Sequence, residues 1–171
     1  MSRAIRTMRL DKEASGKVPL SPGFFLLPSS LYPGEEPMEQ GHTVVAASNE
    51  AGRTFIRLLL YKQLPVAALT NNKKEAKLLE QIGVPDILHV RTTHTKEVSA
   101  PAFPIRRLMI FESSLPLTCQ YLLLTARWSV KTIMVITSAR HPEAVYKSLG
   151  ASCVVYSQTG EVGFLLSRLN D

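Results

Sequence analysis

TVVAASNEAGRTFIRLLLYKQLPVAALTNN, residues 43 to 72, is the stretch on which the fold prediction depends. Its apolar residues 44–47 predict a buried strand, and Asn49 is a suitable N-cap for a helix that follows. Four apolar residues of that helix share one face, the spacing of a helix that covers a sheet. They are Ala51, Phe55, Leu58 and Leu59. Residues 66–69 predict a second strand. We therefore expect a strand, a polar turn, a helix and a strand, which is the first unit of an α/β fold.

The same alternation continues to the end of the chain. Further strands are expected over residues 87–90, 107–111, 132–136 and 153–156. Helices are expected over 73–82, after a cap at Ser113 or Ser114, over 142–149 and at the end of the chain, where Val162, Leu165, Leu166 and Leu169 form an apolar stripe. The helix after Ser114 is expected to bury Leu115, Cys119, Leu122, Leu123 and Ala126. Two successive strand-helix-strand halves predict a doubly wound, mainly parallel six-stranded sheet of order 3-2-1-4-5-6. Because the strands are almost continuously apolar, both faces of this sheet should be covered.

Residues 1–42 predict an irregular arm in front of a domain of residues 43–171. Five prolines, at positions 19, 22, 28, 33 and 37, forbid a long helix and discourage a central strand. The cluster Phe24, Phe25 and Leu26 is too apolar for a free tail. We expect it to pack on its own domain or on a second subunit, which favours a homo-oligomer such as a dimer.

The composition narrows the class of partner. With 171 residues, of which 45% are hydrophobic and 20% charged, the chain suits one globular core. No apolar run approaches the roughly 18–20 residues that span a bilayer, and no apolar signal core follows the basic start MSRAIRTMRL. A cytoplasmic location without membrane contact is the default expectation. The net charge of +6 favours a small anionic ligand, whereas the dispersed basic residues argue against a nucleic-acid surface. Cys119 and Cys153 lie far apart without histidine neighbours, so no metal site is expected.

A ligand of such a sheet binds outside the carboxyl ends of the strands, at the switch point between the first and fourth strands. In this sequence those ends are residues 48–52 and 112–114. Glu112 is the carboxylate best placed to face the switch point. It is expected either to contact a ribose or substrate hydroxyl, or to cap the next helix.

Two segments support a resemblance to a known superfamily. SLGASCVVY, residues 148–156, and QIGVPDILHV, residues 81–90, resemble the helix end and following strand of medium-chain dehydrogenases. Residues 43–171 resemble the NAD(P)-binding Rossmann superfamily, as a degenerate member near atypical short-chain and quinone-reductase-like dehydrogenases. The resemblance implies NAD(P) binding through the first turn and kinship with reductases.

The cofactor turn departs from the pattern of this superfamily. Its three glycines would fall on Ala46, Asn49 and Gly52, so only the third, which lets helix and strand pack closely, is present. Asn49 adopts the left-handed conformation more readily than most residues, and the helix N-terminus, from Ser48 to Arg53, still offers N–H groups to an anion. The second strand is followed by Asn71, Asn72 and Lys73 where an acidic residue usually holds the ribose of NAD. If a dinucleotide binds, this cluster favours NADP.

Two hypotheses follow from these features. The first is a nucleotide-binding protein related to NAD(P)-dependent reductases, with cofactor contacts from Ser48, Asn49, Gly52, Arg53, Asn71, Asn72, Lys73 and Glu112. The second is a non-catalytic regulatory or protein-interaction module that binds no cofactor. No catalytic pair decides between them, because the adjacent residues Tyr146 and Lys147 point in different directions on a helix. Whether the protein is an enzyme is left open by the sequence.

Overall fold

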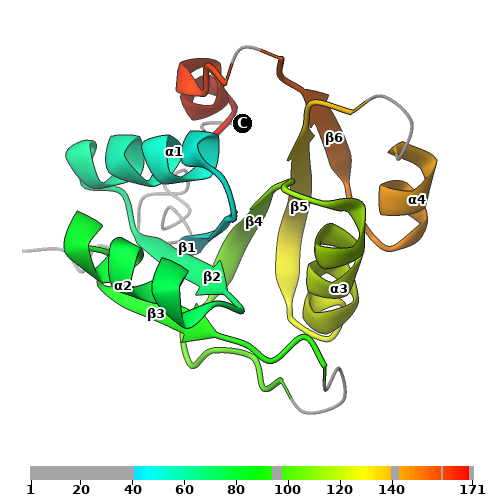
Figure 1. Cartoon of the computed structure of the whole chain (residues 1–171), viewed down its shortest axis with the longest axis horizontal. Helices are drawn as coiled ribbons and strands as arrows, with labels where there is room; N and C mark the ends of the chain where they lie inside the picture. Colours follow the sequence, from blue (N-terminus) through cyan, green and yellow to red (C-terminus); the bar gives the residue numbers. More distant parts are fainter. Residues whose placement is uncertain (1–40, 94–97, 140–142, 159, 170–171) are drawn as a thin grey trace, which may run out of the picture. The chain divides into compact units, whose positions relative to one another are not determined.

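The computed structural model describes residues 41–93, 98–139, 143–158 and 160–169 (Figure 1). All of them belong to one compact unit of the chain, Glu36–Asp171. Of the predicted arm only Gly41 and His42 are described, and His42 already begins the first strand. The structure of the arm and its role in an oligomer therefore stay predictions.

Six parallel strands form one sheet of order β3-β2-β1-β4-β5-β6. They are β1 His42–Ala47, β2 Val66–Thr70, β3 Asp86–His89, β4 Ile105–Phe111, β5 Val130–Thr137 and β6 Cys153–Tyr156. The central strands are buried along most of their length, as the apolar runs in their sequences indicate, with Arg106 and Arg107 near the start of β4 as an interruption. The predicted doubly wound sheet is confirmed.

Helices cover both faces of this sheet. One face carries α1 Glu50–Tyr61, α2 Lys73–Ile82 and the 3-10 helix η2 Gly163–Leu169, and the other carries α3 Leu115–Thr125 and α4 Glu143–Ser148 (Figure 1). The first face buries Phe55, Ile56, Leu59, Leu79 and Leu165, and the second buries Tyr121, Leu122, Leu124 and Tyr146. The helix that we expected at the end of the chain is η2, a short 3-10 helix. No helix in the described part of the chain combines the length and the apolar character needed to cross a membrane.

The face that α3 turns to the sheet differs in part from the predicted stripe. Leu122 is buried as expected, but Leu123 is 50% exposed, Ala126 is also exposed, and Tyr121 is fully buried. The sequence LPLTCQYLLLT is apolar on almost every side of the helix, so its periodicity does not specify the buried face. The orientation of α3 is therefore fixed by tertiary packing.

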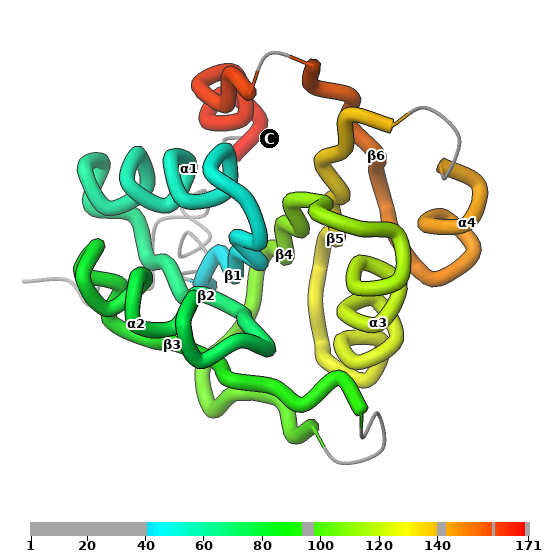
Figure 2. The backbone as a smooth tube through the Cα atoms, viewed as in Figure 1, coloured from blue at the N-terminus to red at the C-terminus, as the bar shows by residue number. Residues whose placement is uncertain are grey.

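The connection from β3 to β4 has no helix in its described parts, residues 90–93 and 98–104. Val98 and Phe103 pack against the α3 side of the core, where the Trp128 indole N–H donates to the Val98 carbonyl at 3.5 Å. The ring of Phe103 lies 4.2 Å from that of His42. In the backbone tube, β1 leads into α1 on one face whereas β4 leads into α3 on the other (Figure 2). The switch point thus lies between the carboxyl ends of β1 and β4.

Candidate functional site at the carboxyl edge of the sheet

The turn between β1 and α1 consists of Ser48 and Asn49. Asn49 is the N-cap of α1, since its side-chain oxygen accepts from the Gly52 N–H at 2.9 Å. Its side-chain nitrogen donates to the Glu112 carbonyl at 2.8 Å, which joins the turn to the end of β4. Asn49 has φ −143° and ψ 175°, an extended conformation rather than the left-handed one that we considered. The turn is therefore held by the Asn49 side chain instead of by glycine backbone freedom.

Gly52 allows α1 to lie directly on β1. A Cβ atom at this position would lie 2.7 Å from the Ala47 Cα atom and 3.1 Å from the Phe111 Cβ atom. This is the packing role expected of the third glycine. The residue that meets Gly52 is Ala47, whereas Ala46 faces the opposite side of the sheet. The alignment of the missing first glycine with Ala46 stays a prediction.

The end of β2 forms a second polar group. The Asn71 N–H donates to the Tyr121 hydroxyl at 3.1 Å, and this hydroxyl donates to the Asn71 side-chain oxygen at 3.3 Å. The Asn71 side-chain nitrogen donates to the Thr92 hydroxyl at 3.4 Å. Burial, with the negative charge of Glu75 as a smaller cause, raises the pKa of Tyr121 to about 12. The tyrosine is therefore a neutral hydrogen-bonding group at physiological pH.

Glu75 supplies a carboxylate at the same place. The Thr70 hydroxyl donates to Glu75 Oε2 at 2.5 Å, and burial raises the pKa of Glu75, an effect that the Thr70 bond and the charge of Arg53 partly oppose. Glu75 lies three residues after Asn72, the N-cap of α2, which accepts from the Lys74 N–H at 2.9 Å. An acidic residue three positions after an N-cap is the spacing of a capping box, and this spacing could have drawn attention to Glu75 in the sequence. In the structure the Glu75 carboxylate binds the Thr70 hydroxyl and not the backbone of Asn72.

Glu112 connects three elements at the switch point. Its carboxylate accepts from the Thr137 hydroxyl at the end of β5 and, at 2.5 Å, from the Tyr146 hydroxyl of α4. Burial and the bond to Glu112 raise the pKa of Tyr146, which keeps this donor protonated. Both carboxylate oxygens thus have partners within the protein. Because each oxygen accepts only one of these bonds, the expected contact of Glu112 with a ligand stays a prediction.

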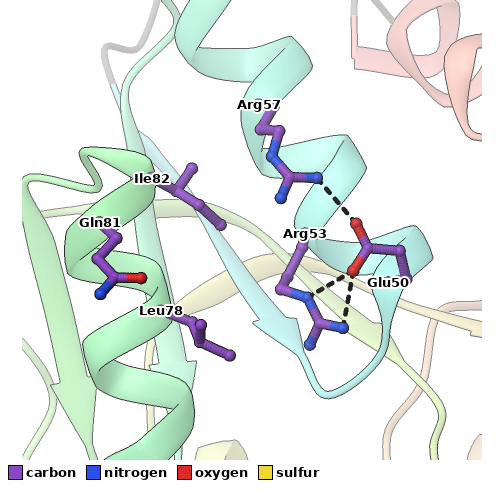
Figure 3. A pocket seen from close by; sticks show the side chains of 6 residues that line it. All are labelled: Glu50, Arg53, Arg57, Leu78, Gln81 and Ile82. Carbon is purple, nitrogen blue, oxygen red and sulfur yellow. Dashed lines mark hydrogen bonds and ion pairs between the residues drawn. The ribbon is translucent and has the colours of Figure 1, made fainter.

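Arg53 lies at the side of the switch point, in a hollow of about 510 Å³ between α1 and α2 (Figure 3). Its guanidinium binds the Glu50 carboxylate with nitrogen-oxygen distances of 2.8 and 2.9 Å, and Arg57 binds the second Glu50 oxygen at 2.9 Å. These two arginines lower the pKa of Glu50. Leu78, Gln81 and Ile82 of α2 complete the hollow.

The structure brings only some of the predicted residues together. Ser48, Asn49, Gly52 and Glu112 meet at the switch point, and Asn71 adjoins them through Tyr121. Asn72 and Lys73 are exposed at the start of α2, and Arg53 is paired with Glu50. Tyr121 and Glu75 were missed by the sequence analysis. No cluster of metal-ligating side chains occurs among the residues that the structure describes.

Comparisons with known proteins give structural neighbours only. No family model and no curated protein matches the chain. The NAD(P)-binding domain of an exopolyphosphatase-related protein from Archaeoglobus fulgidus is 20% identical with a TM-score of 0.56, covering 75% of this chain and 96% of that one. The TrkA-N domain of the inner membrane protein ybaL from Escherichia coli is 13% identical with a TM-score of 0.51, covering 79% and 99%.

A GsuK channel bound to NAD is 19% identical with a TM-score of 0.55 over 67% of this chain, which spans only 21% of the channel chain. At these identities the likeness shows the fold alone. The finer resemblance to short-chain and quinone-reductase-like dehydrogenases is not confirmed. The chain has a six-stranded Rossmann-like fold, and its likeness to these three structures is a likeness of fold.

Proposed function

We propose that the chain binds a nucleotide at the switch point, between the β1–α1 turn and the end of β4. The observation that carries this proposal is the close packing at Gly52, which sets the N-terminus of α1 against the end of β1. Backbone N–H groups at such a terminus bind phosphate oxygens. Ser48 and the Asn71–Tyr121 pair add hydroxyl and amide groups beside it.

The form of the nucleotide depends on two opposing features at the end of β2. Lys73 and Lys74 are exposed in the first turn of α2 and favour the 2′-phosphate of NADP, as the sequence indicated. The Glu75 carboxylate, which accepts a hydrogen bond from the Thr70 hydroxyl, lies in the same turn of α2. It favours a ribose without a 2′-phosphate. We keep NADP as the proposed cofactor and make the comparison with NAD its test.

A role in binding, without catalysis, is the second part of the proposal. The Tyr146 hydroxyl is bound to Glu112, whereas Lys147 is exposed and paired with Glu143 at 2.7 Å. This tyrosine and lysine therefore do not form a pair, in agreement with their spacing. We therefore propose that the chain is a regulatory module rather than a reductase.

Thermal-shift titration with NAD, NADH, NADP, NADPH and ADP tests this function. A ligand at 100 times its Kd stabilises the fold by about 2.7 kcal/mol, which gives a readily measured rise in Tm. Gly52→Val and Lys73→Gln should reduce the response, and Lys77→Gln, an exposed lysine one turn further along α2, is the matched control. Equal responses of all four proteins would refute the proposed site.

A module without any cofactor is the second candidate. It is favoured by the mutual pairing of Asn49, Glu112, Thr137 and Tyr146, which leaves these groups satisfied without a ligand. The absence of a shift with all five nucleotides at millimolar concentration would support it.

A further inference from the structure

A cavity of about 610 Å³ lies at the amino edge of the sheet, where β4 and β5 begin, at the opposite end of the strands from the proposed nucleotide site. The apolar part of its wall consists of Pro104, Ile105, Trp128 and Val130. Ile105 and Val130 lie side by side, because they are partners in the β4–β5 ladder. The volume falls within the roughly 300–1,000 Å³ of pockets that hold small molecules. The size and the apolar wall thus suit a small ligand with an apolar body.

The wall of this cavity is held in place by hydrogen bonds of the protein itself. The Val130 N–H donates to the Trp128 carbonyl at 2.9 Å, and the Pro104 carbonyl accepts from the His42 N–H at 2.9 Å. The indole N–H of Trp128 donates to the Val98 carbonyl at 3.5 Å. A wall that is ordered before a ligand arrives lowers the entropic cost of binding.

A β-bulge places an arginine at this cavity. The register between β1 and β4 shifts between His42 and Thr43, so Arg106 has no partner on β1. Bulges change the direction of a side chain, and they are frequent beside functional sites. A Cβ atom on Gly41 would lie 2.7 Å from the Arg106 Cβ atom and 2.8 Å from its backbone nitrogen. The bulged backbone can therefore lie against the start of β1 only because residue 41 is glycine.

The wall carries one cation whose charge is not compensated. Arg106 is half-buried and forms no hydrogen bond or ion pair with another described residue. Lys131, the other cation of the wall, already has an interaction within the protein. None of the described residues in the wall is acidic, and Ser129 adds a hydroxyl group. Removing part of a guanidinium from water without a partner costs free energy, and one bound negative charge would recover it.

The charge and the apolar wall together indicate the class of ligand. A carboxylate carries one negative charge and accepts two parallel N–H bonds from an arginine. A phosphate group carries about −1.5 to −2 near neutral pH, which would leave excess charge beside apolar side chains. We propose that this cavity binds a small carboxylic acid with an apolar body, its carboxylate at Arg106. The proposal does not depend on nucleotide binding at the opposite edge.

The fluorescence of Trp128 tests the proposal, because it is the only tryptophan of the chain and lies in the cavity wall. Titration of the full chain with octanoate should give a saturable change in emission. Octanamide, which has the same chain without the charge, should bind at least about tenfold more weakly, because hydrogen bonds between charged groups are strong. Arg106→Gln should remove this preference by weakening octanoate binding alone. The control Arg127→Gln removes the same charge from an exposed position outside the cavity and should keep the preference.

Three outcomes would overturn the proposal. They are the absence of a saturable response to octanoate, equal affinities of the wild-type chain for octanoate and octanamide, and an equal loss of preference in the two arginine variants. If Arg106→Gln does not fold, Ser129→Phe serves instead, since a ring added at this exposed wall position should obstruct both probes. Ser113→Phe, at an exposed position outside the cavity, is its control, and an octanoate affinity that is the same in both phenylalanine variants would also overturn the proposal.

Discussion

Replacing Gly52 with alanine should destabilise the domain even though alanine is the better helix former. The added Cβ atom would lie 2.7 Å from the Ala47 Cα atom, a backbone atom that cannot rotate away, and 3.1 Å from the Phe111 Cβ atom. Overpacking of this kind costs about 1–3 kcal/mol, while exchanging glycine for alanine inside a helix gains at most about 1 kcal/mol. We therefore expect the free energy of unfolding to fall by about 1–2 kcal/mol.

Urea denaturation followed by circular dichroism measures this change. With an m-value of about 2 kcal/mol/M, the midpoint should fall by about 0.5–1 M at unchanged m. Gly163→Ala is the matched control, because no atom lies within 4 Å of its added Cβ and its backbone is not left-handed. It should be neutral or slightly stabilising. A Gly52→Ala midpoint equal to or above that of the wild type would refute the close packing of α1 on β1.

Three further predictions concern the switch point and the arm. Glu112→Gln should lower the free energy of unfolding by about 1–3 kcal/mol in the same urea assay, because the amide cannot accept both hydroxyl donors, whereas Tyr146→Phe should cost only about 1 kcal/mol. The pKa of Glu75 is raised by burial, so its stabilising contribution is complete below its unfolded pKa and is lost as the pH rises through the folded value. Glu75→Gln should therefore flatten the decrease in stability above pH 4.5, and an unchanged pH profile would contradict the buried carboxylate. Deletion of residues 1–40 should reduce the oligomeric state in light scattering if the arm joins subunits, and an unchanged mass would exclude this role.

The sequence predicted the strands well because each is a local pattern. Cys153–Tyr156 was placed with its observed bounds, and β1 and β4 differ from prediction by two residues at their amino ends. Asn49 was identified as a cap from local chemistry alone, since an N-cap bonds to a residue two or three positions away.

The contacts that define the site were not predictable in this way. Tyr121 meets Asn71 across 50 residues, and Glu112 meets Tyr146 across 34. These pairs depend on how α3 and α4 are oriented on the sheet, and the sequence of α3 is too uniformly apolar to specify its orientation. Residue types at the rim could thus be read from the sequence, whereas their partners required the fold.

The charge at the carboxyl edge of the sheet bears on which nucleotide this edge can bind. The carboxyl edge has Glu50, Glu75 and Glu112 close to the proposed nucleotide site, with Arg53 and Arg57 already paired with Glu50. Away from Lys73 and Lys74, which favour a 2′-phosphate, each further phosphate would meet repulsion from these carboxylates, so binding should depend on neutral donors such as the Asn71 and Tyr121 groups. The affinity for a nucleotide should therefore fall as phosphates are added at its 5′ end. Titration of the chain with AMP, ADP and ATP measures this trend, and an affinity that rises from AMP to ATP would contradict it.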